Sequence, residues 1–139
     1  MVVGAGKVAL RKVQGLLEAG ACVTVVAPRW QPEFERLPLQ LLRRPFEPGD
    51  LAGATLVFSA TDDRAVNHAV AEEAHRRDIA ANIADAKEEC DFLVPARITR
   101  GALQIAVSTG GQSPRVAAEL RRTIEAAMDA IYSDPGGTS

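Results

Sequence analysis

The stretch MVVGAGKVALRKVQGLLEAGACVTVVAP, residues 1–28, decides the fold of this 139-residue chain. It begins with apolar residues typical of a β-strand and turns at Gly4 and Gly6. Apolar residues then recur at helical spacing over residues 8–19, and a second β-rich segment follows at residues 22–27. Because a short strand–helix–strand unit is the building block of parallel sheets, we predict an α/β fold.

The glycine turn between the first strand and the helix has the spacing of a dinucleotide-binding loop. Residues 4–9 read G-x-G-x-x-A, in which the first glycine makes a tight turn and the second lets backbone amides approach a diphosphate. The positive end of the helix dipole favours the same anion. We therefore expect a bound dinucleotide, with a purely structural glycine turn as the alternative. The expected cofactor-binding residues are Gly4, Ala5, Gly6, Lys7 and Val8.

The end of the second strand leaves the choice of dinucleotide open. NAD sites usually carry Asp or Glu here to bind the ribose hydroxyls, whereas this strand ends in Ala27, Pro28 and Arg29. An arginine suits a 2′-phosphate, so Pro28 and Arg29 are expected beside the ribose of either NAD or NADP.

The rest of the sheet is predicted from alternating strand and helix patterns up to residue 94. Strands are expected at residues 39–42, 55–61 and 79–83, with a helix from Asp62 and Asp63 to about residue 77. Ligands of parallel sheets bind at the carboxyl ends of strands, so Ala60 and Thr61 are expected on the nicotinamide side. We predict a Rossmann-type sheet, with helices on both faces, over residues 1–94.

A single carboxylate, Asp85, follows the fifth strand at the same edge of the sheet. We expect it to act as a catalytic general base, made more basic by burial. The alternative is an ordinary turn residue. Asn82, within that strand, is expected to contact the substrate.

The chain changes character from residue 95, where short strands with Pro and Gly breaks replace the strand–helix alternation. We expect residues 95–139 to form a small α+β segment that ends in a helix begun by Ser113 and Pro114. One side of that helix is apolar and forms either core or a subunit interface. The preceding STGGQSP loop suits oxyanions, and its expected substrate-binding residues are Ser108, Thr109, Gly110, Gly111 and Ser113.

Composition excludes several classes of protein. A net charge of −2 argues against general affinity for nucleic acid or anionic membranes. Five arginines against one acidic residue in residues 95–122 favour an anionic ligand. Cys22 and Cys90 have no metal-site spacing, so we expect no metal and two small buried thiols in a reducing compartment. His68 and His75 are expected to face solvent. With no secretory or membrane-spanning pattern, the expected location is the cytoplasm.

Several separated motifs resemble one family in order and spacing. They are VVGAGKVALRKVQGLLEAGACVTVVAP, FSATDDRAVNHAV, NIADAKEECDFLVPARITRGALQIAVSTGGQSP and AAELRRTIE. Together they resemble the amino-terminal module of siroheme synthases, the precorrin-2 dehydrogenases. The resemblance covers nearly the whole chain, although Met1 already stands within the first strand and no methyltransferase sequence follows. We therefore expect the first strand to be short.

This resemblance implies NAD-dependent oxidation of precorrin-2 to sirohydrochlorin in siroheme biosynthesis, with insertion of ferrous iron in some members. It also implies that residues 95–139, after the Rossmann domain, form a homodimer and bind the tetrapyrrole substrate. Asp85 falls on the family's essential carboxylate, and Thr109 falls on the hydroxyl position near the tetrapyrrole. The arginines after residue 95 would meet substrate carboxylates. Two alternatives are a non-catalytic dinucleotide-sensing module and a chelatase without redox chemistry.

Overall fold

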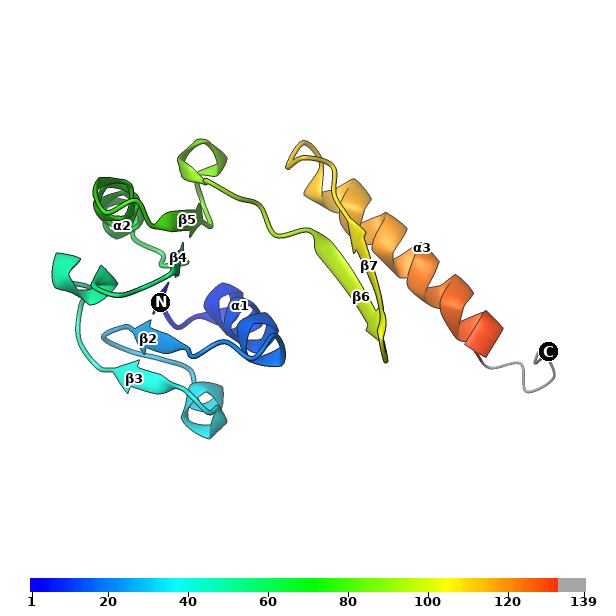
Figure 1. The fold of residues 1–139 in the computed structure, drawn as a ribbon, viewed down its shortest axis with the longest axis horizontal. Coiled ribbons are helices and arrows are strands. Elements are labelled where there is room, and N and C mark those ends of the chain that lie inside the picture. Colours follow the sequence, from blue (N-terminus) through cyan, green and yellow to red (C-terminus); the bar gives the residue numbers. More distant parts are fainter. Residues whose placement is uncertain (133–139) are drawn as a thin grey trace. The chain divides into compact units, whose positions relative to one another are not determined.

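The computed structural model describes residues 1–132, which belong to two compact units, Met1–Phe92 and Leu93–Ser139 (Figure 1). The tail that we expect to fray, residues 133–139, lies outside the described residues. Each unit is described separately below.

The first unit contains a five-stranded parallel sheet in the order β3-β2-β1-β4-β5. Strand order reverses between β1 and β4, which is the switch point of a Rossmann fold, as predicted. The first strand is short, as expected, and each of the other four is shorter than the sequence pattern indicated. The strands are β1 (Val2–Val3), β2 (Thr24–Val26), β3 (Gln40–Leu42), β4 (Leu56–Ser59) and β5 (Ala80–Ile83).

Two helices and two 3-10 turns connect these strands, a third 3-10 turn follows β5, and the sheet is buried on both faces. Val2 packs in one hydrophobic cluster with Ala9 and Val13 of α1, whereas Val3 packs in the other with Val70 of α2. Neighbouring strand residues therefore point to opposite, equally apolar faces. The connecting elements are α1 (Lys7–Glu18), η1 (Pro32–Arg36), η2 (Pro48–Leu51) and α2 (Arg64–Arg76), and the turn after β5 is η3 (Lys87–Glu89).

The second unit is a β-hairpin covered by one helix. Strands β6 (Ala96–Arg100) and β7 (Leu103–Val107) pair antiparallel, and Gly101 adopts φ +56° at their turn. Helix α3 (Pro114–Tyr132) packs on them through Ala117 and Met128, and Ile98 is the buried strand residue. The predicted small α+β segment with a carboxyl-terminal helix is therefore present.

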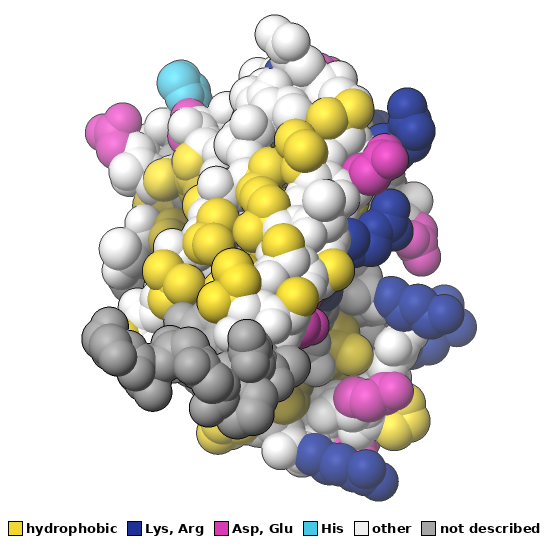
Figure 2. Space-filling view, turned by 90° about the vertical axis from the view of Figure 1, so that its right-hand side faces the viewer, with side chains coloured by type: hydrophobic (Ala, Val, Ile, Leu, Met, Phe, Trp, Pro, Cys, Tyr) yellow, Lys and Arg dark blue, Asp and Glu magenta, His cyan; other side chains and the backbone are white. Residues whose placement is uncertain are grey.

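The side of α3 next to its buried side stays exposed. Val116, Leu120 and Ile131 expose 38%, 47% and 72% of their surfaces. Figure 2 shows hydrophobic side chains gathered in a band along this helix, with basic side chains beside them. One side of the helix is thus core, and the adjacent side is an apolar surface.

The prediction for Cys22 is wrong. Strand β2 begins at Thr24 rather than at residue 22, so Cys22 lies in the exposed connection after α1. Cys90 is partly buried, and its thiol lies 3.1 Å from the amide of Ile83. Both thiols are free.

Candidate functional site

Gly4 makes possible the close approach of the first turn to β4. Its φ of +99° lies in the region that favours glycine, and a Cβ here would stand 2.5 Å from the carbonyl oxygen of Ala60. Its amide donates to the Val26 carbonyl oxygen at 3.0 Å. Gly4 is therefore required where the turn passes between the ends of β2 and β4.

Gly6 is a glycine for a different reason from Gly4. A Cβ at Gly6 would meet nothing within 4 Å, so protein packing does not demand a glycine there. Gly6 is the N-cap of α1, and no side chain of residues 1–132 accepts a hydrogen bond from the free amides of the first turn. No acidic residue occupies that turn either, and Lys7 and Val8 are exposed. The open backbone and unfilled positive helix end fit a diphosphate.

The loop after β2 runs beside this glycine turn. The amide of Gln31 donates to the carbonyl oxygen of Ala5 at 3.3 Å, which ties the two segments together. Pro28 and Arg29 lie between that bond and the strand, and both are exposed. The structure thus brings these two predicted residues to the same edge of the sheet as the glycines.

The loop after β4 is shaped by Asn67, a residue that the sequence analysis missed. Its buried side chain accepts from the Ser59 hydroxyl at 2.8 Å and from the Thr61 amide at 3.2 Å, and donates to the Thr61 carbonyl oxygen at 3.1 Å. Ala60 and Thr61 are thereby fixed above the switch point. Asp63 caps α2 by accepting from the Ala65 amide at 2.9 Å, as its sequence position suggested.

Asp85 lies at the same edge of the sheet, after β5, but it is not buried. Its side chain is 38% exposed and accepts a hydrogen bond from the Arg64 guanidinium at 3.1 Å. The expectation that burial tunes this carboxylate is therefore wrong, because the turn after β5 carries it to the surface. Arg64 also pairs with Glu89 and, together with His68, lowers the pKa of that carboxyl.

Asn82 points into the first unit rather than out of it. It is 5% exposed, accepts from the Lys12 ammonium at 2.8 Å and donates to the Phe92 carbonyl oxygen at 2.9 Å. Burial lowers the pKa of Lys12, which also lies over the Phe58 ring. Asp91, which precedes Phe92, forms two hydrogen bonds with Ala81 of β5. Its carboxylate accepts from the Ala81 amide at 2.8 Å, and its amide donates to the Ala81 carbonyl oxygen at 2.9 Å. These bonds anchor residues 91 and 92 along β5.

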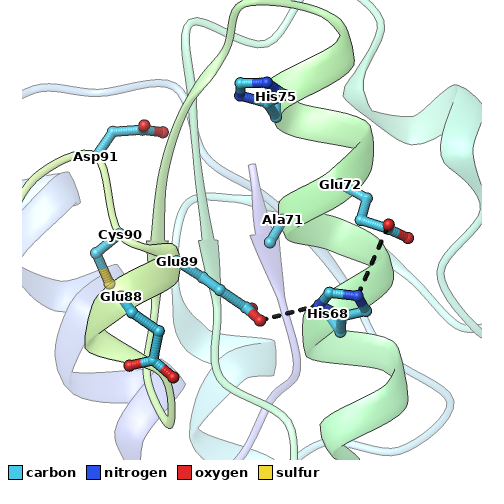
Figure 3. Close-up of a pocket in the computed structure, with 8 residues that line it drawn as sticks. All are labelled: His68, Ala71, Glu72, His75, Glu88, Glu89, Cys90 and Asp91. Carbon is cyan, nitrogen blue, oxygen red and sulfur yellow. Dashed lines mark hydrogen bonds and ion pairs between the residues drawn. The ribbon is translucent and has the colours of Figure 1, made fainter.

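A hollow between α2 and η3 gathers seven titratable side chains (Figure 3). His68 lies between Glu89, at 2.9 Å, and Glu72, at 3.7 Å, and both His68 and His75 are exposed as predicted. Within residues 1–132, no three His, Cys, Asp or Glu side chains are grouped to hold a metal ion. The hollow is therefore lined by ion pairs and no metal site is assigned to it.

In the second unit, the STGGQSP loop bonds mainly to itself. The Ser108 hydroxyl accepts from the Gly110 amide at 3.2 Å, and the Thr109 hydroxyl accepts from the Ser113 amide at 3.0 Å. Gly110 and Gly111 adopt φ of +60° and +73°, and the Ser113 hydroxyl caps α3 through the Val116 amide. The loop is thus a defined turn whose hydroxyls also shape it.

Acidic residues further along α3 neutralise part of the basic segment. Arg100 pairs with Asp129 at 2.9 Å, and Arg121 pairs with Glu125 at 2.6 Å. The excess positive charge expected from residues 95–122 is smaller in the folded unit, because Glu125 and Asp129 follow directly after these residues and pair with two of the arginines. Arg122 stays exposed.

Two family models match this chain, and the boundary between them lies close to the boundary between the two units. Residues 1–96 match the family model described as "Putative NAD(P)-binding". The chain belongs to this NAD(P)-binding family. Residues 100–127 match a second model, described as "Sirohaem biosynthesis protein central". The sequence resemblance to the amino-terminal module of siroheme synthases is thereby confirmed.

Relatives of this NAD(P)-binding family member carry consistent names. The chain is 46% identical to the siroheme synthase of Methylobacillus flagellatus and 45% identical to that of Methylococcus capsulatus, each match covering 95% of this chain. It spans 29% of the length of each of these two relatives. A solved structure of SirC, a precorrin-2 dehydrogenase, matches with a TM-score of 0.75 and 32% identity, covering 94% of this chain and 64% of that one.

None of the helices described in this family member is long and apolar enough to cross a membrane. The expected cytoplasmic location stays a prediction.

Proposed function

We propose that this chain is an NAD-dependent dehydrogenase module that oxidises precorrin-2 to sirohydrochlorin in siroheme biosynthesis. The single observation that carries the proposal is the unfilled amino terminus of α1 behind Gly6, in a chain 32% identical to a precorrin-2 dehydrogenase of known structure. The names of the relatives support the same pathway.

The cofactor would be held by the chain's own backbone. The amides of Gly6, Lys7 and Val8 would donate to the diphosphate, since no side chain occupies them. Ala60 and Thr61, held by Asn67, would line the nicotinamide side. When bound, NAD⁺ supplies the acceptor for a hydride from the substrate.

Asp85 would accept the proton released with that hydride. Its exposed carboxylate can reach a large ligand, and the Arg64 guanidinium holds it in place. Asp85→Asn is expected to lower kcat at least a hundredfold and leave the NAD⁺ affinity unchanged. Glu88→Gln, which alters a nearby exposed acid, is the matched control. Full turnover by Asp85→Asn would remove this residue from the mechanism.

The second unit would bind the polycarboxylate substrate. Arg97 and Arg122 are exposed and match carboxylates in charge and shape. The STGGQSP loop presents Ser108, Thr109 and the amides around Gly110 and Gly111 as further donors. Ser113 would act by fixing the loop to α3.

The same unit would form a homodimer. A two-stranded hairpin is marginally stable alone, and the exposed apolar side of α3 would be covered by a second copy.

Anaerobic mixing of the folded chain with precorrin-2 and NAD⁺ tests the proposal. The sirohydrochlorin spectrum together with stoichiometric NADH is the expected result. NAD⁺ binding without turnover would favour the dinucleotide-sensing module instead. Fe²⁺ added after oxidation tests metal insertion, and siroheme formed without NAD⁺ from supplied sirohydrochlorin would identify chelatase activity.

A further inference from the structure

Glu89, at the end of the turn η3, contacts two side chains of α2 and has no role in the proposed reaction. Its Oε1 accepts a hydrogen bond from the Arg64 guanidinium and lies 2.9 Å from Nδ1 of His68 (Figure 3). Arg64 and His68 are four residues apart, so they share one face of the helix. Arg64 most, and His68 next, lower the pKa of the Glu89 carboxyl, which is therefore ionised at neutral pH.

The second oxygen of Glu89 is costly to the fold. Oε2 is buried, and no side chain or backbone group within residues 1–132 forms a hydrogen bond with it. A buried polar atom without a partner lowers stability. The position of Glu89 is therefore not explained by stability alone, and the oxygen that does have partners is the one that holds Arg64.

The Arg64 guanidinium is divided between two carboxylates. Its Nη2 donates to Glu89, and its Nη1 donates to Oδ1 of Asp85 at 3.1 Å. The other oxygen of Asp85, Oδ2, accepts no hydrogen bond from the part of the chain that the structure describes. An arginine that faces a single carboxylate commonly bonds both of its oxygens. The division therefore leaves Oδ2 open, on a side chain that is 38% exposed.

We propose that Glu89 is a positioning residue for the dehydrogenase, because it holds Arg64 to one oxygen of Asp85 and leaves Oδ2 free to accept the proton. This inference rests on the proposed function, in which Asp85 takes the proton released with the hydride. Without the Glu89 charge, Arg64 would bond both oxygens of Asp85 and neutralise it more fully. Isolated ion pairs at a surface contribute little, but here one guanidinium is shared by two carboxylates within a network.

Steady-state kinetics of the whole folded chain with precorrin-2 and NAD⁺ test this proposal. Glu89→Gln keeps the size of the side chain and removes its charge. It should lower kcat at least tenfold and change the KM of either substrate less than twofold, because the defect lies in the proton step and not in binding. Glu88→Gln, which alters an exposed acid in the same turn, is the matched control and should change neither constant.

A double variant separates this role from a structural one. Arg64→Gln added to Glu89→Gln frees Asp85 from the guanidinium, and it should raise kcat at least threefold above that of Glu89→Gln alone. A merely structural role of Glu89 would leave the double variant equal or worse, and that result would overturn the inference. A kcat of Glu89→Gln within twofold of the unaltered chain would also overturn it.

Titration calorimetry with NAD⁺ counts the folded, binding-competent chains in each variant. The fraction that binds NAD⁺ should be the same in Glu89→Gln as in the unaltered chain. A fall in that fraction equal to the fall in kcat would mean unfolding and would overturn the inference, while the proposed function would stand. Absence of turnover in the unaltered chain would overturn the proposed function and the inference with it.

Discussion

The two units use hydrophobic side chains in opposite ways. The first unit buries its sheet between two clusters, so that neighbours such as Val2 and Val3 both lie in core. The second covers a two-stranded hairpin with one helix, buries Ile98, Ala117 and Met128, and leaves larger apolar side chains exposed on α3. The first unit therefore completes its own core, whereas the second leaves an apolar surface that we propose a second copy covers.

The largest expected effect is a break in the core of the first unit. Gly4→Val places a branched side chain at φ +99° against the Ala60 carbonyl oxygen. Strain and overlap together should lower the free energy of unfolding by about 3 kcal/mol or more. Urea unfolding of both proteins measures this change.

Gly6→Ala is the matched control, because its Cβ enters open space. It should lower the free energy of unfolding by no more than about 1 kcal/mol. A Gly4→Val protein as stable as the unaltered chain would show that the turn does not need the close approach to β4.

An intermediate effect is expected at the surface of the second unit. Leu120→Glu places a charge in the middle of the exposed apolar side of α3. If a second copy covers this side, the dimer dissociation constant should rise at least tenfold, because burying an unpaired charge is costly. Sedimentation velocity over a range of concentrations measures it.

Arg122→Glu introduces the same charge on another face of α3 and should leave the dissociation constant within threefold. An unaltered monomer–dimer equilibrium in Leu120→Glu would remove the apolar side of α3 from the interface. A second copy of the chain would then have to contact a different surface of the second unit.

The smallest expected effect is a dependence on pH within the first unit. Arg76 and Arg77 lower the pKa of Glu73 from 4.5 to about 2. Because the folded-state pKa is the lower one, this stabilisation is present above about pH 4.5 and is lost as the pH falls toward 2. Glu73→Gln should therefore lower the urea midpoint at neutral pH and make it less sensitive to acid.

Glu72→Gln, an exposed neighbour on α2, is the control and should keep the acid sensitivity of the unaltered chain. Parallel acid profiles for the unaltered chain and Glu73→Gln would mean that these ion pairs add nothing to stability.

Local patterns were enough to predict the order of elements. The glycine spacing at residues 4–9, the apolar run before Thr61 and the Ser113–Pro114 helix start each depend on neighbours in sequence, and each predicted element is present. The parallel sheet was predicted because alternating strands and helices are typical of one.

Long-range partners could not be read from the sequence. Arg64 and Asp85 are 21 residues apart, and nothing in either segment indicates that they pair. Asn67 could have been noticed as a polar residue on the apolar side of α2, whereas the bond of Asn82 to Lys12 joins residues 70 positions apart. The charge counted over residues 95–122 also overestimated the positive charge of the second unit, because Asp129 lies outside that range and pairs with Arg100.

The anchoring of Asp91 and Phe92 along β5 has a consequence for solubility. The outer edge of a sheet normally offers free amides and carbonyls to which a strand of another molecule can add. Here Asp91 hydrogen-bonds to the amide and the carbonyl oxygen of Ala81, and the Cys90 thiol contacts the amide of Ile83. At these two residues of β5 the backbone groups therefore already have partners. Copies of the chain are thereby discouraged from polymerising edge to edge, and the short β3 offers little length for it at the opposite side.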